Sequence, residues 1–481
     1  MDAGTSWGLW SLTPLAVTLV LAFATRSALI AMLVGTFVGT LMLGGVPGVG
    51  LNELLQSALG NGDFIWIVLI VVLIGVLFEG FREAGVLDVL SDRAAGAGED
   101  TTAGDDARSR RRGRRRVQLA TWGMGLLIVD DYFSPLMAGA VMRPMSDRMG
   151  IPREKLAYIL DATTASVCIL VPFTAWGAYL ASLIAAQGGP VSGVEEGLAV
   201  FIRALPYNFY PILTLLFALL IAAGIVPDFG PMRTAERRAR ETGAVLRPGA
   251  NPLLREDLAP SAPRAERRQG SLALELALPI TVVIGIFLAS LVLSGSVRIV
   301  EAFLAGCTVL IVVLSVRGKL RSAADVGGLV MRGAESVVPA LLIVALAYAL
   351  NDVARQLGVG DAVVGLFEAG PGSGALVPLT FLVTAAVSFA TGTSWGAFAL
   401  MMPVSLPAAV SLAGGTLDPL VYQTVAAVAG GGIFGDHASP VSDTTVLAST
   451  GAGSDHMDHV ITQLPYALAV AGVTLGLYVL L

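Results

Sequence analysis

Apolar runs as long as a membrane-spanning helix recur along the whole chain. Such a helix needs about 20 mostly apolar residues to cross a hydrocarbon core of about 30 Å. Only 14% of the residues are charged, whereas an average soluble protein has roughly a quarter. The sequence therefore predicts an all-α polytopic membrane protein. Its uninterrupted apolar runs cover residues 9–25, 27–45, 64–81, 205–227, 273–294, 299–316, 334–351 and 464–481, and blocks broken by polar clusters cover 118–142, 156–187, 377–407 and 420–450.

The sequence lacks the features that are typical of several other classes of protein. No basic residue precedes the first apolar run, so we expect a membrane helix there and not a cleaved signal peptide. Cys168 and Cys307 lie in predicted membrane segments, which indicates neither a disulfide framework nor a thiolate metal site. No phosphate-binding loop is present, so we expect no nucleotide, nucleic acid or cofactor. An intramembrane aspartyl protease would need G-x-G-D, but the sequence that ends at Asp436 is GGIFGD and lacks this pattern, so we do not expect an enzyme.

Basic residues mark the cytoplasmic side of a membrane protein, and here they cluster. Basic residues flank the block 118–142 on both sides, with seven arginines between Arg108 and Arg116 and four basic residues from Arg143 to Lys155, which predicts that it enters and leaves on the cytoplasmic face as a re-entrant hairpin. Both flanks of the block 377–407 are poor in basic residues, which predicts a second hairpin from the outside. The predicted topology has about 10 transmembrane helices plus two opposed hairpins, or 12 helical segments, with both termini outside. Plain crossings by both blocks remain the alternative.

Two polar segments separate the membrane parts. Residues 93–116 and 228–272 are rich in arginine and are predicted to be solvated cytoplasmic linkers. Their role is to set the topology, with contact to anionic lipid headgroups as the alternative. The chain is thereby divided into a first repeat over residues 1–227, a linker over 228–272 and a second repeat over 273–481.

Two short motifs occur once in each half of the chain. DYFSP shares D-x-x-S-P with DHASP, and TAWGAY is similar to TSWGAF. Asp131 precedes Thr174 by 43 positions, and Thr393 precedes Asp436 by the same 43. Inverted repeats with interrupted helices at corresponding positions mark the central binding site of a transporter. The residues expected at these helix breaks and hairpin tips are Pro135, Thr174, Trp176, Gly177, Thr393, Ser394, Trp395, Gly396 and Pro440.

Several aspartates fall inside predicted membrane segments. An ionised carboxylate at the middle of a membrane helix costs about 2.5–3.5 kcal/mol on insertion scales. No Lys or Arg lies beside these aspartates in the sequence, so a bound cation or a proton is needed to balance their charge. A site that holds either one, and opens to each side in turn, exchanges the two. The aspartates are Asp130, Asp131, Asp161, Asp436 and Asp443, of which Asp131, Asp436 and Asp443 are the strongest candidates.

Oxygen ligands suited to a small hard cation surround these aspartates. Prolines and glycines beside them interrupt the helix and free carbonyl oxygens. For Thr163, a hydrogen bond between helices is an equal alternative, and Trp176 and Trp395 either belong to the site or simply pack. The side chains predicted to complete the ion site are Ser134, Thr163, Ser439, Ser442, Thr444, Thr445 and His437.

Two further histidines follow the second D-x-x-S-P motif. His456 and His459 are spaced i, i+3 and have aspartates beside them, a pattern that binds metals or senses pH in some proteins. A solvated inner loop explains the same pattern, and this is the structure that we expect there.

The two longest polar stretches of the membrane part carry a family resemblance. VDDYFSPLMAGAVMRPMSDRMGIPREKLAYILDATTASVCILVPFTAWGAY and GDHASPVSDTTVLASTGAGSDHMDHVITQLPYA closely resemble the NhaC-type sodium/proton antiporter family of the ion-transporter superfamily. The resemblance covers most of the chain outside the linkers. It implies exchange of sodium for protons across a prokaryotic cell membrane, in an inverted-repeat fold with hairpins.

Similar proteins also exchange organic acids or amino acids in a sodium- or proton-coupled way, so this substrate class stays an alternative. The arginine-rich linkers depart from a compact member of the family. The partners that we expect are sodium, protons and the lipid bilayer, and assembly as a homodimer is left open.

Overall fold

The computed structural model describes the whole chain except residues 1–6, 26, 45–48, 61, 87–88, 90–106, 128, 130, 173, 188, 192, 254–269, 295–297 and 360–371. Asp130, a predicted site residue, therefore lies outside the described residues. Within the described part the elements are helices, and an isolated β-bridge joins Pro252 to Asp455. The predicted all-α class is confirmed.

The helices of the first half are mostly apolar, and a helix satisfies its own backbone hydrogen bonds, as lipid requires. They are α1 (Thr13–Thr25), preceded by a 3₁₀ turn (Gly8–Leu12), α2 (Ala28–Met42), α3 (Val49–Leu59), α4 (Gly62–Ala84), α6 (Ala107–Leu127), α7 (Phe133–Arg148), α8 (Arg153–Leu170), α9 (Ala175–Ala185), α10 (Val194–Ala204) and α11 (Phe209–Ala222).

The second half begins after the polar segment that contains α12 (Gly230–Thr242). Its helices are α13 (Leu278–Ser294), preceded by a π-helical turn (Leu272–Ala277), α14 (Ile299–Val316), α15 (Ala323–Gln356), α17 (Ser373–Thr391), α18 (Ser394–Leu412), α19 (Pro419–Ala438), α20 (Asp443–Ala452) and α21 (His456–Leu480).

Four of the helices are long and apolar enough to cross a membrane, judged by length and composition of the described residues. Two bent helix pairs raise this number to six if each pair is one span. The predicted multi-pass character is supported, whereas the topology of ten crossings and two hairpins stays a prediction. The four are Gly8–Thr25, Gly374–Thr391, Ser394–Leu412 and His456–Leu480, and the pairs are Glu195–Tyr207 with Phe209–Ala222 and Ala323–Val338 with Leu341–Gln356.

Two helical hairpins lie where the polar blocks of the sequence are. In the first, α6 and α7 run antiparallel, because Arg114 near the start of α6 donates a hydrogen bond of 3.0 Å to the carbonyl oxygen of Met149 beyond the end of α7. In the second, α17 and α18 pack together, and only Gly392 and Thr393 separate them. Gly392 has φ +72°, a left-handed conformation that glycine adopts without strain.

The helix after each hairpin is interrupted. α8 ends at Leu170 and α9 begins at Ala175, while α19 ends at Ala438 and α20 begins at Asp443. The four segments that carry the D-x-x-S-P and T-x-W-G-A motifs are therefore the two hairpin tips and these two breaks. Proline removes a backbone donor, and Thr174 and Thr393 cap the helices that follow by accepting hydrogen bonds from Gly177 N and Gly396 N.

Helices α4 and α15, which precede the two hairpins in their respective halves, pack antiparallel. The rings of Phe64 and Tyr348 meet near one end of the pair with centroids 5.8 Å apart, and Arg332 binds Glu79 at 2.7 Å near the other. A Cβ atom on Gly75 or Gly333 would collide with the backbone of the opposite helix, so the two backbones approach closely.

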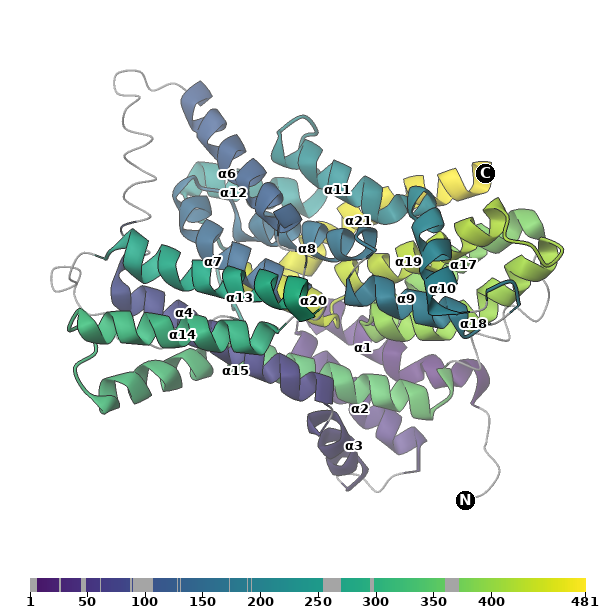
Figure 1. Cartoon of the computed structure of the whole chain (residues 1–481), viewed down its shortest axis with the longest axis horizontal. Coiled ribbons are helices and arrows are strands. Elements are labelled where there is room, and N and C mark those ends of the chain that lie inside the picture. Colours follow the sequence, from purple (N-terminus) through teal and green to yellow (C-terminus); the bar gives the residue numbers. More distant parts are fainter. Residues whose placement is uncertain are drawn as a thin grey trace.

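Residues 228–253, which we call the docked arm, are not the solvated linker that the sequence predicted. Met232, Ala235 and Ala239 are buried, and their i, i+3, i+7 spacing forms one apolar stripe on α12. Figure 1 shows α12 beside α6, against the body of the protein. Of the other predicted linker, residues 107–116 belong to helix α6. The prediction of a solvated linker failed because it rested on the number of arginines. A narrow apolar stripe on one face of α12 is enough to pack the helix against the protein, although its other face is polar.

Two large apolar cores fill the molecule and meet at the interrupted helices. One core includes α4, α14 and α15 together with Val441, and the other includes α17 to α19 together with Trp176. In Figure 1, α4 and α14 lie on the left, α17 and α18 on the right, and α8 and α20 between them. The polar breaks thus lie where the two cores meet.

Candidate ion site

Asp436 lies in the last turn of α19 and accepts hydrogen bonds from two hydroxyl groups. Ser442, from the break that follows, donates to Oδ1 at 2.7 Å, and Ser394, from the tip of the α17–α18 hairpin, donates to Oδ2 at 3.1 Å. The side chain is 2% exposed. A hairpin tip and a helix break that are distant in sequence therefore share one carboxylate.

Asp443 is the first residue of α20 and lies on the other side of the same break. Its Oδ1 accepts a hydrogen bond of 2.8 Å from the backbone N–H of Thr444, and its Oδ2 accepts one of 3.1 Å from the hydroxyl of Tyr132. The hydroxyls of Ser442 and Thr444 lie 3.0 Å apart. The two hydroxyls therefore connect Asp436 to Thr444, whose backbone N–H binds Asp443.

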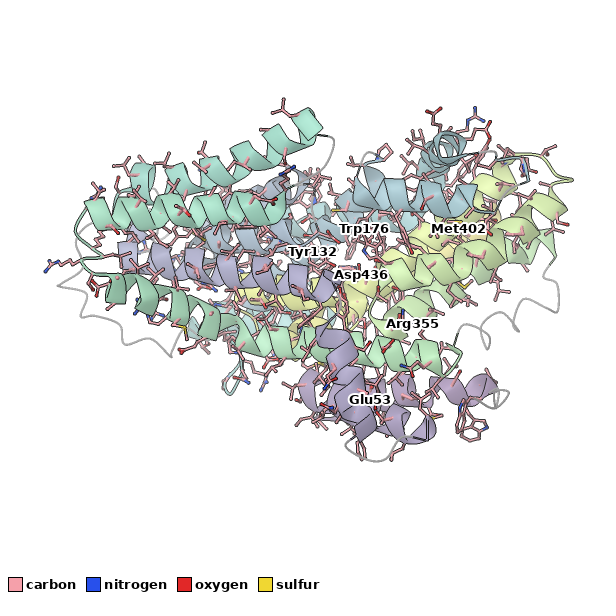
Figure 2. All side chains as sticks on the ribbon, turned by 60° about the horizontal axis from the view of Figure 1, so that its bottom comes forward. Glu53, Tyr132, Trp176, Arg355, Met402 and Asp436 are labelled. Atoms are coloured by element: carbon pink, nitrogen blue, oxygen red, sulfur yellow. The ribbon has the colours of Figure 1, made fainter. Side chains whose placement is uncertain are left out.

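Asp131 lies at the tip of the α6–α7 hairpin, where its Oδ2 accepts a hydrogen bond of 3.1 Å from Nε1 of Trp176. The aspartate of each D-x-x-S-P motif thus binds the T-x-W-G-A motif of its own half, through Trp176 in the first half and through Ser394 in the second. The two T-x-W-G-A motifs also meet, since the rings of Trp176 and Trp395 lie edge to face with centroids 5.7 Å apart. Figure 2 shows Tyr132, Trp176 and Asp436 near the centre of the molecule.

The donors around Asp436 and Asp443 are neutral. Among the described residues, no Lys, Arg or His lies within ion-pair distance of either carboxylate. Hydroxyl and amide donors stabilise a buried carboxylate but do not cancel its charge. The arrangement therefore leaves room for a mobile positive charge, either a cation or a proton.

Asp161 belongs to a different polar cluster, in the middle of α8. Its Oδ2 accepts a hydrogen bond of 3.0 Å from Gln463 and lies 3.6 Å from Nε2 of His459. The same Gln463 amide donates to the carbonyl oxygen of His437 at 2.6 Å. The ring of His437 meets the hydroxyl of Tyr210 at 3.0 Å, so it joins this second cluster and not the carboxylates of Asp436 and Asp443.

The expectation of a solvated loop at His456 and His459 is wrong. Both imidazoles are buried in the first turns of α21, and Nδ1 of each lies within hydrogen-bond distance of the Ser449 hydroxyl. Nε2 of His456 is 2.8 Å from the carbonyl oxygen of Pro440. The prediction failed because the polar residues around these histidines face α20 and the docked arm.

The remaining predicted ligands play several roles. Thr163 donates to carbonyl oxygens of its own helix, Ser439 donates to the carbonyl oxygen of Phe389 at 2.6 Å, and Thr445 donates to the carbonyl oxygen of Asp436 at 2.9 Å. Ser134 is buried, and its hydroxyl has no hydrogen-bond partner among the described residues. Ser439 and Thr445 thus hold the backbone of the break, whereas the Ser442 hydroxyl binds Asp436 and the Thr444 backbone N–H binds Asp443.

Tyr132, Tyr210, Ser449 and Gln463 were missing from the predicted site. Tyr132 lies inside the D-x-x-S-P motif, so its motif position was the available signal. The other three carry none, because single Tyr, Ser and Gln residues in membrane helices are common packing and hydrogen-bonding groups.

A pocket of about 540 Å³ opens beside the tip of the α17–α18 hairpin. Thr391 and Gly396 of the hairpin and Tyr348, Asp352 and Arg355 of α15 line it. Asp352 and Arg355 form an ion pair with each other in this wall. Ser394, which binds Asp436, lies between Thr391 and Gly396 in the sequence, so the pocket adjoins the hairpin tip that contacts this carboxylate.

Comparisons with known proteins point to one family. A sequence model of the Na⁺/H⁺ antiporter family matches residues 167–481. The chain is 31% identical over 490 residues to an uncharacterized protein of Haemophilus influenzae, covering 98% of this chain and 90% of that protein. It is also 41% identical to an uncharacterized Na⁺/H⁺ antiporter of the same organism, over 78 residues that cover 16% of each chain.

A further local similarity involves an amino acid exchanger. The chain is 36% identical over 105 residues to the arginine/ornithine antiporter ArcD of Halobacterium salinarum, covering 22% of this chain and 21% of that protein.

Proposed function

The chain belongs to the Na⁺/H⁺ antiporter family and is a multi-pass secondary transporter, and on this premise we propose that it exchanges sodium for protons across a prokaryotic cell membrane. Asp436 and Asp443 are the groups that bind the cation, with Ser442 and Thr444 as neutral oxygen ligands between them. Asp131, held by Trp176, completes the acidic centre from the other hairpin. In this proposal the two halves form an inverted repeat.

The observation that carries the proposal is a pair of buried carboxylates with neutral donors only. Ser394, Ser442, Tyr132 and the Thr444 amide satisfy the lone pairs of Asp436 and Asp443 and leave the charge unbalanced. Sodium is a hard cation that prefers oxygen ligands, and a proton neutralises the same carboxylates. Occupancy by one disfavours the other, because each offsets the same buried negative charge.

Alternating access follows from the breaks and tips around this centre. Hairpin tips and helix breaks absorb backbone rotation at few residues, which suits the gates of a transporter. The pocket lined by Thr391 and Gly396 is the path by which the ion reaches the α17–α18 tip. Movement of that tip would separate Ser394 from Asp436 and open the centre to one side.

The test uses the purified chain in liposomes that hold a preformed pH gradient and a pH-sensitive dye. Added sodium should dissipate the gradient, and Asp436→Asn and Asp443→Asn should each reduce the sodium-dependent signal to background. Glu301→Gln is the matched control, because Glu301 is an exposed carboxylate on α14. If sodium leaves the gradient of the unmodified protein intact while the protein is present in the membrane, the proposal fails.

The similarity to ArcD favours a second candidate, a sodium- or proton-coupled exchanger of an amino acid or small organic acid. An acidic centre suits a cationic amino acid better than an anionic acid, since no fixed cation faces Asp436 or Asp443 among the described residues. Uptake of radiolabelled arginine, ornithine and dicarboxylates into liposomes loaded with unlabelled substrate distinguishes the candidates. Uptake without any sodium-dependent proton flux would support the second.

A further inference from the structure

We propose that the exchanged proton is carried by the pair Asp161 and His459, separate from the cation at Asp436 and Asp443. This inference rests on the proposed sodium/proton exchange. It assigns the two transported species to two clusters that share one helix break, the segment between α19 and α20.

The pair is enclosed. Asp161 is 1% exposed and His459 is 0% exposed, and Oδ2 of the carboxylate lies 3.6 Å from Nε2 of the imidazole. Neither Asp161 Oδ1 nor His459 Nε2 has a hydrogen-bond partner among the described residues. Two polar atoms that are buried without partners are costly, so their retention calls for a functional reason.

The hydrogen bonds around the pair determine which imidazole nitrogen of His459 carries its proton. The carbonyl oxygen of Pro440 can only accept, so His456 must donate to it from Nε2, 2.8 Å away. Neutral His456 then accepts at Nδ1, and the hydroxyl of Ser449, 3.1 Å away, is its donor. Having used its hydrogen, Ser449 accepts from Nδ1 of His459 at 2.9 Å.

This chain leaves Nε2 of neutral His459 without a hydrogen and facing the Asp161 carboxylate. Ser449 also lies 2.8 Å from the carbonyl oxygen of Thr445. If its hydrogen went there instead, the Ser449 oxygen would still accept from Nδ1 of His459, so Nε2 of neutral His459 would again lack a hydrogen. Two acceptors therefore face each other across 3.6 Å, and one added proton would turn this contact into a hydrogen-bonded ion pair.

The amide of Gln463 cannot supply that proton. It has two N–H groups, and these donate to Asp161 and to the carbonyl oxygen of His437. The titratable groups that face the pair are Asp436 and His437 on α19, Tyr210 on α11 and His456 on α21, while α20 faces it with Thr445 and Ser449. None of these groups fills the position between Asp161 and His459.

Two side chains of this cluster, His456 and Gln463, form hydrogen bonds with backbone carbonyl oxygens at the break between α19 and α20, where the proposed cation site lies. His456 binds the carbonyl oxygen of Pro440, and Gln463 binds the carbonyl oxygen of His437, next to Asp436. A proton on His459 would draw the Asp161 carboxylate toward the imidazole and away from Gln463. The break would then lose one of its supports, which couples the proton to the geometry of Asp436 and Asp443.

The test separates proton coupling from sodium binding in liposomes that contain the full chain. Exchange of labelled for unlabelled sodium needs no net proton movement, whereas sodium uptake driven by a pH gradient does. His459→Gln removes the imidazole that takes up the proton and leaves a neutral side chain in its place. We expect gradient-driven uptake to fall by about tenfold or more, which corresponds to about 1.4 kcal/mol, and sodium-for-sodium exchange to stay at the level of the Glu301→Gln control.

Asp161→Asn tests the same pair from the other side and replaces His459→Gln if that variant does not accumulate in the membrane. An unchanged pH profile of gradient-driven uptake in these variants overturns the inference, and so does equal loss of both kinds of exchange. Absence of sodium-for-sodium exchange in the unmodified protein instead contradicts the proposed sodium function itself, so the two failures are distinguishable.

Discussion

Buried carboxylates occur in two regions of this molecule, and their partners differ. Where the docked arm meets the body, Glu236 binds Arg114 at 2.5 Å and Lys155 at 3.1 Å, and Glu154 binds Arg238 at 2.9 Å. At the centre, Asp436 and Asp443 bind hydroxyls and a backbone amide. The first set has fixed cations, and the second has none among the described residues.

The difference separates carboxylates that hold the fold from carboxylates that bind a mobile charge. A buried ion pair tolerates burial because each charge compensates the other, and removing one partner leaves an uncompensated charge. At the centre the compensating charge is free to leave. Stability should therefore depend on the side chains of the arm, and transport on those of the centre.

The largest effect on stability is expected from Lys155→Ala. Lys155 is buried at the start of α8 and binds Asp228 at 2.8 Å as well as Glu236. Its removal leaves two acidic groups short of a partner, so the free energy of unfolding should fall by about 3–5 kcal/mol. Chemical or thermal unfolding of the purified protein in detergent measures this. A loss no greater than that of an exposed control, Arg298→Ala, would show that the arm is not held by its ion pairs.

The second prediction concerns sodium affinity. Ser442→Ala removes the 2.7 Å hydrogen bond to Asp436. A hydrogen bond to a charged group contributes about 1.5–3 kcal/mol, so the sodium concentration for half-maximal exchange should rise roughly ten- to 150-fold. Thr424→Val is the matched control, because the Thr424 hydroxyl bonds to the carbonyl oxygen of Leu420 in its own helix. Equal sodium affinity in the Ser442→Ala and Thr424→Val variants would show that Ser442 does not bind sodium.

The third prediction compares one chemical change in both regions. Asp436→Asn removes a charge that has neutral donors only, so in sodium-free buffer the free energy of unfolding should stay level or rise by about 1 kcal/mol. Glu154→Gln leaves the guanidinium of Arg238 without its carboxylate and should lower stability. Thermal unfolding of both variants gives the signs. The same sign in both would erase the distinction between the two regions.

The sequence located the features that act over a few residues. Prolines, glycines and N-cap threonines interrupt helices locally, so the D-x-x-S-P and T-x-W-G-A motifs indicated where helices stop. Contacts between side chains that are far apart in the sequence could not be predicted from it, for example Arg114 with Glu236 and Asp161 with His459. Nothing in a stretch of arginines tells which of them faces a carboxylate of another helix, so the docked arm appeared to be a solvated linker.

The smallest effect is expected at the far end of the docked arm. Arg247 donates to both carboxylate oxygens of Asp458, at 3.0 and 2.9 Å, in the first turn of α21. The guanidinium side chain is 38% exposed, and exposed pairs contribute about 0.2–1 kcal/mol. Arg247→Gln should therefore destabilise the protein only slightly, and high salt should remove most of the difference between the variant and the unmodified protein, because salt screens exposed charges.

The pH dependence of this contact has a defined sign. The hydrogen bond with Asp458 raises the pKa of Arg247 above its already high ordinary value. The contribution of the guanidinium charge is complete below the unfolded pKa and is lost only as pH rises through the folded value, in strong alkali. The difference in unfolding free energy between Arg247→Gln and the unmodified protein should therefore be flat across neutral pH. For the Asp161 and His459 variants, in contrast, the pH profile of gradient-driven sodium uptake should differ from that of the unmodified protein. A pH-dependent difference at Arg247 would mean that the arm itself responds to protons, and the division between a structural arm and an exchanging centre would no longer hold.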